Sequence, residues 1–155
     1  MNELYYDDVE LEAALAERAP SLFLAGPTVR RTRRTPWRRE ALGRLAALGF
    51  SGTVVIPEFR DRPFEEAAAE VFASPPGQAP GMRTESFNIL RWETCGIERS
   101  TAVLFWMPFA LGRRDDPISM PGFTTRAEVS RELARDPSRI VLGMPRRVVS
   151  GSQIR

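Results

Sequence analysis

The chain has 155 residues, a formal net charge of +2 and 43% hydrophobic residues, the size and composition of one domain with a buried core. Its single cysteine excludes an internal disulfide. The chain has no histidine, so we expect neither a zinc site nor a Ser-His or Cys-His nucleophile pair. We predict no metal and no cofactor. No apolar run is long enough to span a bilayer and the first residues are acidic, unlike a signal peptide, so we expect a cytoplasmic protein without membrane contact.

Charge is distributed unevenly along the chain. Residues 1–20 hold six acidic residues and one arginine, and we expect an acidic N-terminal arm there, in front of an α/β domain at 21–155. The segment TVRRTRRTPWRR, 28–39, contains six arginines. Three interpretations are open for it: a nucleic-acid patch, a solvated face, or a phosphate-binding mouth beside an active site. No nucleic-acid-binding motif accompanies it, so nucleic acid is the least favoured partner.

Strands and helices are expected to alternate along the domain. Short apolar runs bounded by Gly or Pro predict strands at 21–26, 52–58, 101–108 and 139–145. Helical spacing of apolar residues or helix-forming composition predicts helices at 37–48, 64–73, 87–100 and 124–136. The Pro- and Gly-rich stretches 74–81 and 112–122 are expected to be surface loops. This alternation predicts a three-layer α/β fold with a mostly parallel open sheet.

Ligands of such folds bind at the C-terminal ends of the strands. Gly26, Pro27 and Thr28 follow the first predicted strand, and Glu58 follows the second. The carboxylates near the strand ends are Glu58, Asp115, Asp116 and Glu128, with Glu93 on the helix before the third strand. In a chain without histidine, a carboxylate nucleophile with a second carboxylate as proton donor is a workable chemistry.

Seven short segments follow one another between Phe23 and Pro145: FLAGPT, WRREAL, GFSGTVVIPE, RWE, VLFWMP, PGFTTRAEV and VLGMP. Together they resemble the nucleoside 2-deoxyribosyltransferase-like family. The resemblance implies a Rossmann-like or flavodoxin-like fold, usually a homo-oligomer, that cleaves or exchanges the N-glycosidic bond of a nucleoside or nucleotide. A glutamate of the family attacks C1′ and forms a covalent glycosyl ester, and a second base or water then resolves it.

The residue that matches the nucleophile is Glu128, and the one that matches the carboxylate handling the proton of the departing base is Glu93. For this division of labour, burial or an apolar neighbour such as Trp92 would keep Glu93 partly protonated, while the N-terminus of its helix holds Glu128 ionised. The position six before Glu128, where the transferases often have a sugar-contacting aspartate, is Gly122. Ribose and deoxyribose therefore both stay open.

The expected substrate site is lined by Gly26, Pro27, Thr28, Trp37, Glu58, Trp92, Gly122, Phe123 and Thr125, with Arg30, Arg31, Arg33 and Arg34 as candidates for holding a 5′-phosphate. Structural interpretations compete with several of these. Thr125-x-x-Glu128 is also a capping box, and the tryptophans are also ordinary core aromatics. The alternative function is a catalytically silent nucleotide-binding or sensor module.

Overall fold

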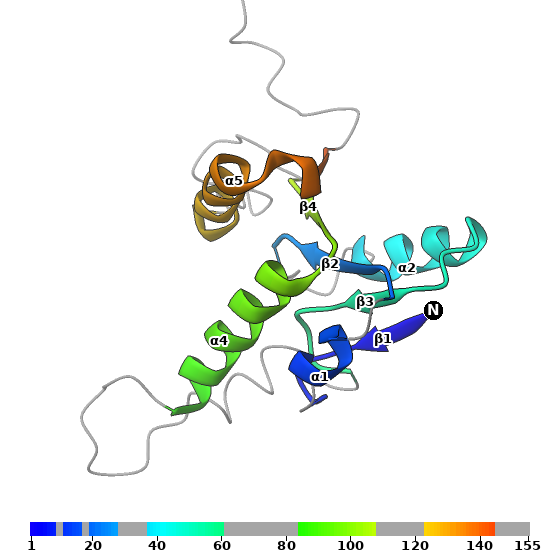
Figure 1. Ribbon diagram of the computed structural model, residues 1–155, viewed down its shortest axis with the longest axis horizontal. Helices are drawn as coiled ribbons and strands as arrows, with labels where there is room; N and C mark the ends of the chain where they lie inside the picture. Colours follow the sequence, from blue (N-terminus) through cyan, green and yellow to red (C-terminus); the bar gives the residue numbers. More distant parts are fainter. Residues whose placement is uncertain (9–10, 17–18, 28–36, 61–83, 108–122, 145–155) are drawn as a thin grey trace, which may run out of the picture.

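A computed structural model describes residues 1–8, 11–16, 19–27, 37–60, 84–107 and 123–144 of the chain. Its centre is a five-stranded, all-parallel sheet in the order β1-β3-β2-β4-β5 (Figure 1). The strands are β1 (Asn2–Leu4), β2 (Ser21–Ala25), β3 (Thr53–Val55), β4 (Ala102–Trp106) and β5 (Ile140–Gly143). The helices are α1 (Leu11–Ala16), α2 (Trp37–Ala47), α4 (Thr84–Arg99), α5 (Phe123–Arg135) and the short 3-10 helix η1 (Pro137–Arg139).

This architecture confirms the predicted three-layer α/β fold with a parallel sheet. The predicted helices at 37–48, 87–100 and 124–136 and all four predicted strands are present, with ends shifted by one to three residues. The predicted helix at 64–73 and the predicted loops at 74–81 and 112–122 lie outside the described residues. None of the helices in the described ranges is long and apolar enough to cross a membrane.

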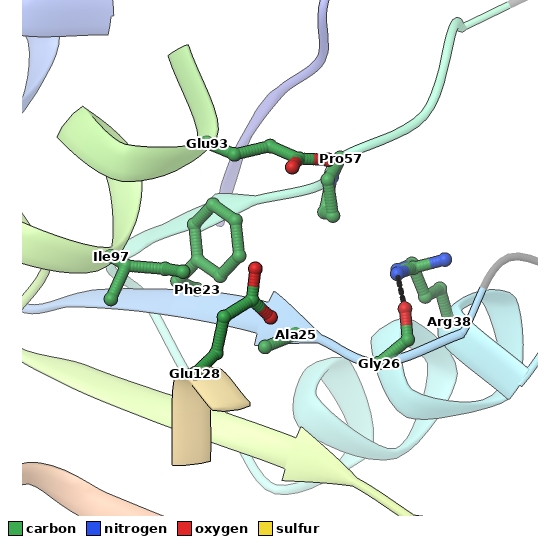
Figure 2. A pocket seen from close by; sticks show the side chains of 8 residues that line it. All are labelled: Phe23, Ala25, Gly26, Arg38, Pro57, Glu93, Ile97 and Glu128. Carbon is green, nitrogen blue, oxygen red and sulfur yellow. Dashed lines mark hydrogen bonds between the residues drawn. The ribbon is translucent and has the colours of Figure 1, made fainter. Parts of the chain in front are cut away.

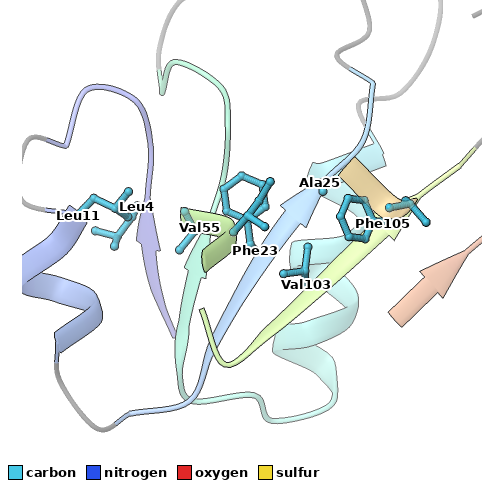
Figure 3. Close-up of a cluster of buried hydrophobic side chains, with 9 residues drawn as sticks. Leu4, Leu11, Phe23, Ala25, Val55, Val103 and Phe105 are labelled. Carbon is cyan, nitrogen blue, oxygen red and sulfur yellow. The ribbon is translucent and has the colours of Figure 1, made fainter. Parts of the chain in front are cut away.

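The central strands bury both of their faces, which is why they read as continuous apolar runs rather than as alternating patterns. On one face, Phe23, Val55 and Phe105 are buried beneath α1, α4 and α5 in a single hydrophobic cluster (Figure 3). On the other face, Leu24 and Val54 are fully buried against α2. The sheet is thus covered from both sides, and its C-terminal edge is where helices from the two layers meet.

The N-terminal segment is part of the sheet, so the expectation that residues 1–20 form an arm in front of the domain needs correction. β1 pairs in parallel with β3, and α1 packs on α4. Leu4 and Leu11 are buried in the hydrophobic cluster. The strand was missed because it has only three residues, NEL, and because an edge strand exposes its polar side chains and needs only one neighbour.

The strand order contains a reversal at β2. The chain runs from β2 to β3 on one side of it and then crosses to β4 on the other. In open parallel sheets the connections at such a point leave in opposite directions, which opens a crevice at the C-terminal ends of the strands. The fold therefore points to the end of β2 as the place for a ligand.

Candidate active site

A pocket lies at this C-terminal end of β2. It encloses about 290 Å³, including the part open to solvent. Figure 2 shows the residues that line it: Phe23, Ala25, Gly26, Arg38, Pro57, Glu93, Ile97 and Glu128. Three of these side chains are charged, and they come from three different helices. No group of three or more potential metal ligands occurs in the described part of the chain.

Glu93 and Glu128, the two residues that the family resemblance singles out, both line this pocket. Glu93 comes from the middle of α4 and Glu128 from the second turn of α5, and Figure 2 shows the two carboxylates directed into the same space. Residues of both helices pack into the hydrophobic cluster on one face of the sheet, so the carboxylates approach the pocket from the same layer. Two carboxylates in one partly buried space cannot both ionise freely.

The pKa of the Glu93 carboxyl is raised, although two neighbours favour its anion. Its Oε1 accepts a hydrogen bond from the hydroxyl of Tyr6. Burial raises the pKa of the Glu93 carboxyl, while the Tyr6 hydrogen bond and the charge of Arg38 act in the opposite direction. Tyr6 was not among the expected site residues, because nothing in the acidic segment LYYDD indicates that one of its tyrosines reaches a pocket lined mainly by residues 23 to 128.

Glu128 has the more strongly perturbed carboxyl. Burial raises its pKa from the ordinary value of 4.5 to about 7, the negative charge of Glu93 adds to this, and Arg131 opposes it. The expectation that the helix N-terminus would hold Glu128 ionised is therefore not met, because burial and the charge of Glu93 raise its pKa. The pKa of both carboxyls is raised, so the pair keeps protons to higher pH than two ordinary glutamates would.

The capping-box interpretation of Thr125 and Glu128 is not supported either. α5 begins at Phe123, so Thr125 is a buried residue inside the helix rather than its N-cap. Glu128 is accordingly available to the pocket. Of Phe123 only the backbone position is described, and Gly122 lies outside the described residues, as do Thr28, Arg30, Arg31, Arg33 and Arg34.

Arg38 is the basic residue of the pocket, and its role was not expected from the sequence. Only 2% of its surface is exposed. Its Nε donates to the carbonyl of Leu24 at 3.1 Å, its Nη2 to the carbonyl of Gly26 at 2.6 Å, and its Nη1 to Oε1 of Glu58 at 2.6 Å. One of the six arginines of 28–39 is thus an internal clamp on the end of β2, which removes it from any nucleic-acid surface.

Glu58 was expected to bind substrate, but its carboxylate is instead the partner of Arg38. The two partners differ in exposure: 27% of the Glu58 side chain is open to solvent, against 2% of the Arg38 side chain. Without this carboxylate the buried guanidinium would lack a counter-charge, and burial already lowers its pKa. Glu58 is therefore the ion-pair partner of a pocket residue and is not itself among the residues that line the pocket.

Gly26 lines the pocket and is required by the backbone. Its φ is +150°, a conformation that other residues rarely adopt, and an added Cβ would lie 2.8 Å from the carbonyl oxygen of Trp106. The neighbouring Pro27 carbonyl accepts a hydrogen bond from the indole of Trp37 at 3.1 Å. Trp37 also stacks on Trp106, so it secures the strand end and is not among the residues that line the pocket.

Trp92 packs behind the catalytic candidate Glu93. Its ring meets that of Tyr6 edge-on at 4.9 Å between centroids and contacts the hydrophobic cluster. Its indole N–H is buried and has no acceptor within the described ranges. The expected role of Trp92 as an apolar neighbour of Glu93 is consistent with this position, whereas stacking on a substrate base is not indicated, because Trp92 does not line the pocket.

Comparison with known proteins adds no assignment. A scan of the chain against models of protein families gives no match, and a search of curated proteins gives none either. What the site can do therefore rests on its own residues: two carboxylates whose pKa values are raised, a buried guanidinium, and apolar side chains at the switch point of a parallel sheet.

Proposed function

We propose that this protein cleaves or exchanges the N-glycosidic bond of a nucleoside or nucleoside 5′-monophosphate, with Glu128 as the nucleophile and Glu93 as the general acid and base. The observation that supports this most is the convergence of these two carboxylates, from two helices, on one pocket at the C-terminal end of β2. They are the same two residues that the resemblance to nucleoside 2-deoxyribosyltransferase-like proteins singles out. An enzyme of this kind would act as a cytoplasmic homo-oligomer.

The reaction proceeds in two displacements at C1′ of the sugar. In the first, a Glu128 oxygen forms a bond to C1′ while the C1′–N bond breaks, and its electron pair leaves with the base, which takes a proton from Glu93. In the second, water or another base attacks C1′, the ester to Glu128 breaks, and Glu93 accepts the proton of the attacking group. This division between nucleophile and acid/base follows the logic of retaining glycosidases.

The pair carries the right number of protons for the first displacement. With the pKa of Glu128 at about 7 and that of Glu93 also raised, the pair can hold one proton near neutral pH. Bond cleavage needs that proton on the leaving base. Positive charge that develops at C1′ over Glu128 favours the ionised form of that carboxylate, so substrate moves the proton toward Glu93 and the leaving base.

The test is incubation with a panel of nucleosides and 5′-monophosphates while free base is followed by chromatography. Glu128→Gln should lower base release by about a thousandfold, and Glu93→Gln by about a hundredfold or more on bases that must be protonated to leave. Glu40→Gln changes an exposed glutamate of α2 and is the matched control. Base release that Glu128→Gln leaves unchanged would exclude the proposed nucleophile.

The second candidate is a nucleotide-binding module without turnover. It is favoured by the raised pKa of Glu128, because a carboxyl that keeps its proton toward neutral pH is a poor nucleophile. This candidate predicts that a nucleoside or monophosphate raises the melting temperature of the protein while no free base is released. The same substrate panel, followed by thermal unfolding and chromatography together, separates the two functions.

A further inference from the structure

The segment that follows β1 is fixed to the segment that follows β3. The amide of Ile56 donates to the carbonyl of Leu4 at 2.8 Å, and the amide of Tyr6 donates to the carbonyl of Glu58 at 3.0 Å. The parallel pairing of β1 with β3 is therefore extended by a further hydrogen bond beyond the strands. It brings Tyr6 to the same edge of the sheet as Pro57, which lines the pocket.

A turn at residues 5–8 secures this placement. The amide of Tyr5 donates to the Asp8 carboxylate at 2.7 Å, and the same carboxylate pairs with the guanidinium of Arg60 at 3.0 Å. The Arg60 guanidinium also lies 4.4 Å from the centre of the Tyr5 ring. The N-terminal segment is thus attached at several points to residues 58–60, and the ion pair of Asp8 with Arg60 is one of these attachments.

The side chain of Tyr6 points from this turn toward α4. Its ring lies between Phe59, at 5.2 Å, and Trp92, at 4.9 Å between centroids. The hydroxyl donates to Oε1 of Glu93. Burial and the charge of Glu93 raise the pKa of the Tyr6 hydroxyl, so it keeps its proton and acts as a permanent donor.

We propose that Tyr6 is the positioning residue of Glu93: its hydroxyl holds one carboxylate oxygen in place and leaves the other free to exchange a proton inside the pocket. The N-terminal segment is then a part of the active site. This inference rests on the proposed function for the role of Glu93 as acid and base. The contact itself is a property of the folded chain and can be tested without turnover.

Burial and two neighbouring groups set the pKa of Glu93, and two further carboxylates lie close to them. Tyr6 donates to it from the N-terminal segment, and Arg38 attracts its charge from α2. Glu58, which follows β3, pairs with Arg38, and Glu128 on α5 shares the pocket. Of these, Tyr6 is the group that hydrogen-bonds to the Glu93 carboxylate. Loss of its hydroxyl should therefore raise the pKa of Glu93 and free its side chain to rotate.

The variant Tyr6→Phe removes the hydroxyl and keeps the ring between its aromatic neighbours. Tyr5→Phe is the matched control, because the Tyr5 hydroxyl donates at 2.8 Å to Glu3, outside the pocket. Carboxyl-labelled glutamate NMR follows the titration of Glu93, whose resonance is identified by its loss in Glu93→Gln. In Tyr6→Phe the Glu93 titration should move to higher pH, and it should stay in place in Tyr5→Phe.

Kinetics on the substrate found in the panel give the second measurement. Tyr6→Phe should lower kcat about tenfold with little change in KM, and should move the acidic limb of the pH profile upward. If Tyr6→Phe does not fold, the wild-type protein still serves: the Tyr6 hydroxyl proton should appear at low field in the NMR spectrum and move upfield in Glu93→Gln.

The outcomes separate this inference from the proposed function. An unchanged Glu93 titration in Tyr6→Phe, or a hydroxyl resonance that Glu93→Gln does not affect, would overturn the role of Tyr6 even in an active enzyme. Absence of base release from the whole panel would overturn the proposed function, while the two NMR measurements would still decide whether Tyr6 positions Glu93.

Discussion

Ionised Glu128 should destabilise the folded protein, and Glu128→Gln should relieve this at alkaline pH. The folded state raises the pKa of Glu128 from 4.5 to about 7, so the folded protein binds the proton more tightly than the unfolded chain does. Stability from this group is complete below pH 4.5 and is lost as the pH rises through 7. The full loss would be roughly 3 kcal/mol, and about 1–2 kcal/mol after discounting for the solvent exposure of the side chain.

Glutamine has nearly the same shape and no charge, so Glu128→Gln should be more stable than wild type by about 1–2 kcal/mol at pH 8, or roughly 3–6 °C in Tm. At pH 4 the two proteins should melt together. Urea unfolding at both pH values measures the difference, with Glu40→Gln as an exposed control. An equal gain at pH 4 and pH 8 would mean that packing, not charge, explains it, and a loss at pH 8 would refute the reasoning.

Further consequences concern the charge pair, the buried arginine and the strand end. With the pKa of Glu128 at about 7, kcat/KM should follow a bell-shaped pH profile that falls above neutrality, where the carboxylate pair loses its last proton, and falls again in acid, where both are protonated. Arg38→Met leaves a carboxylate and two carbonyls without their donor, so it should lower the free energy of unfolding by about 3–5 kcal/mol in urea unfolding. Arg39→Met changes an exposed neighbour and should lower it by less than about 0.5 kcal/mol in the same assay. Gly26→Ala should lower the melting temperature and reduce the free energy of unfolding by about 2–3 kcal/mol, because Gly26 has a φ of +150° and the added methyl would contact a backbone carbonyl. Gly43→Ala on α2 adds a methyl with nothing within 4 Å, so it should raise the free energy of unfolding by about 0.5–1 kcal/mol.

The layers of this fold could be predicted from sequence because its central elements carry strong local signals. The strand at Ser21–Ala25 is an apolar run that ends at Gly-Pro, and the helix at Trp37–Ala47 repeats its apolar residues and stops before a glycine. The edge strand at Asn2–Leu4 has no such signal. Its stability comes from pairing with β3 and from the burial of Leu4, and both are tertiary effects.

The candidate site shows the same division. Glu93 and Glu128 could be proposed from the segments that resemble the nucleoside 2-deoxyribosyltransferase-like family. Glu93 precedes β4 and Glu128 follows it, and both line the pocket. The residues that hydrogen-bond to these carboxylates or shift their pKa could not be predicted from the sequence. Arg38 is one of six arginines in the segment 28–39, and only the path of α2 across the end of β2 buries it. Tyr6 acts across 87 residues, a distance at which no local pattern operates.

The most direct test of the account is to look for the glycosyl ester itself. The wild-type enzyme and the Glu93→Gln variant are mixed with the best substrate of the panel, quenched in acid, digested and analysed by mass spectrometry. The peptide 127–131, AEVSR, contains Glu128 as its only carboxylate side chain. We predict that this peptide gains the mass of the sugar or sugar phosphate and that Glu128→Gln abolishes the gain. Base release that occurs with no adduct on this peptide, and that persists in Glu128→Gln, would contradict the account.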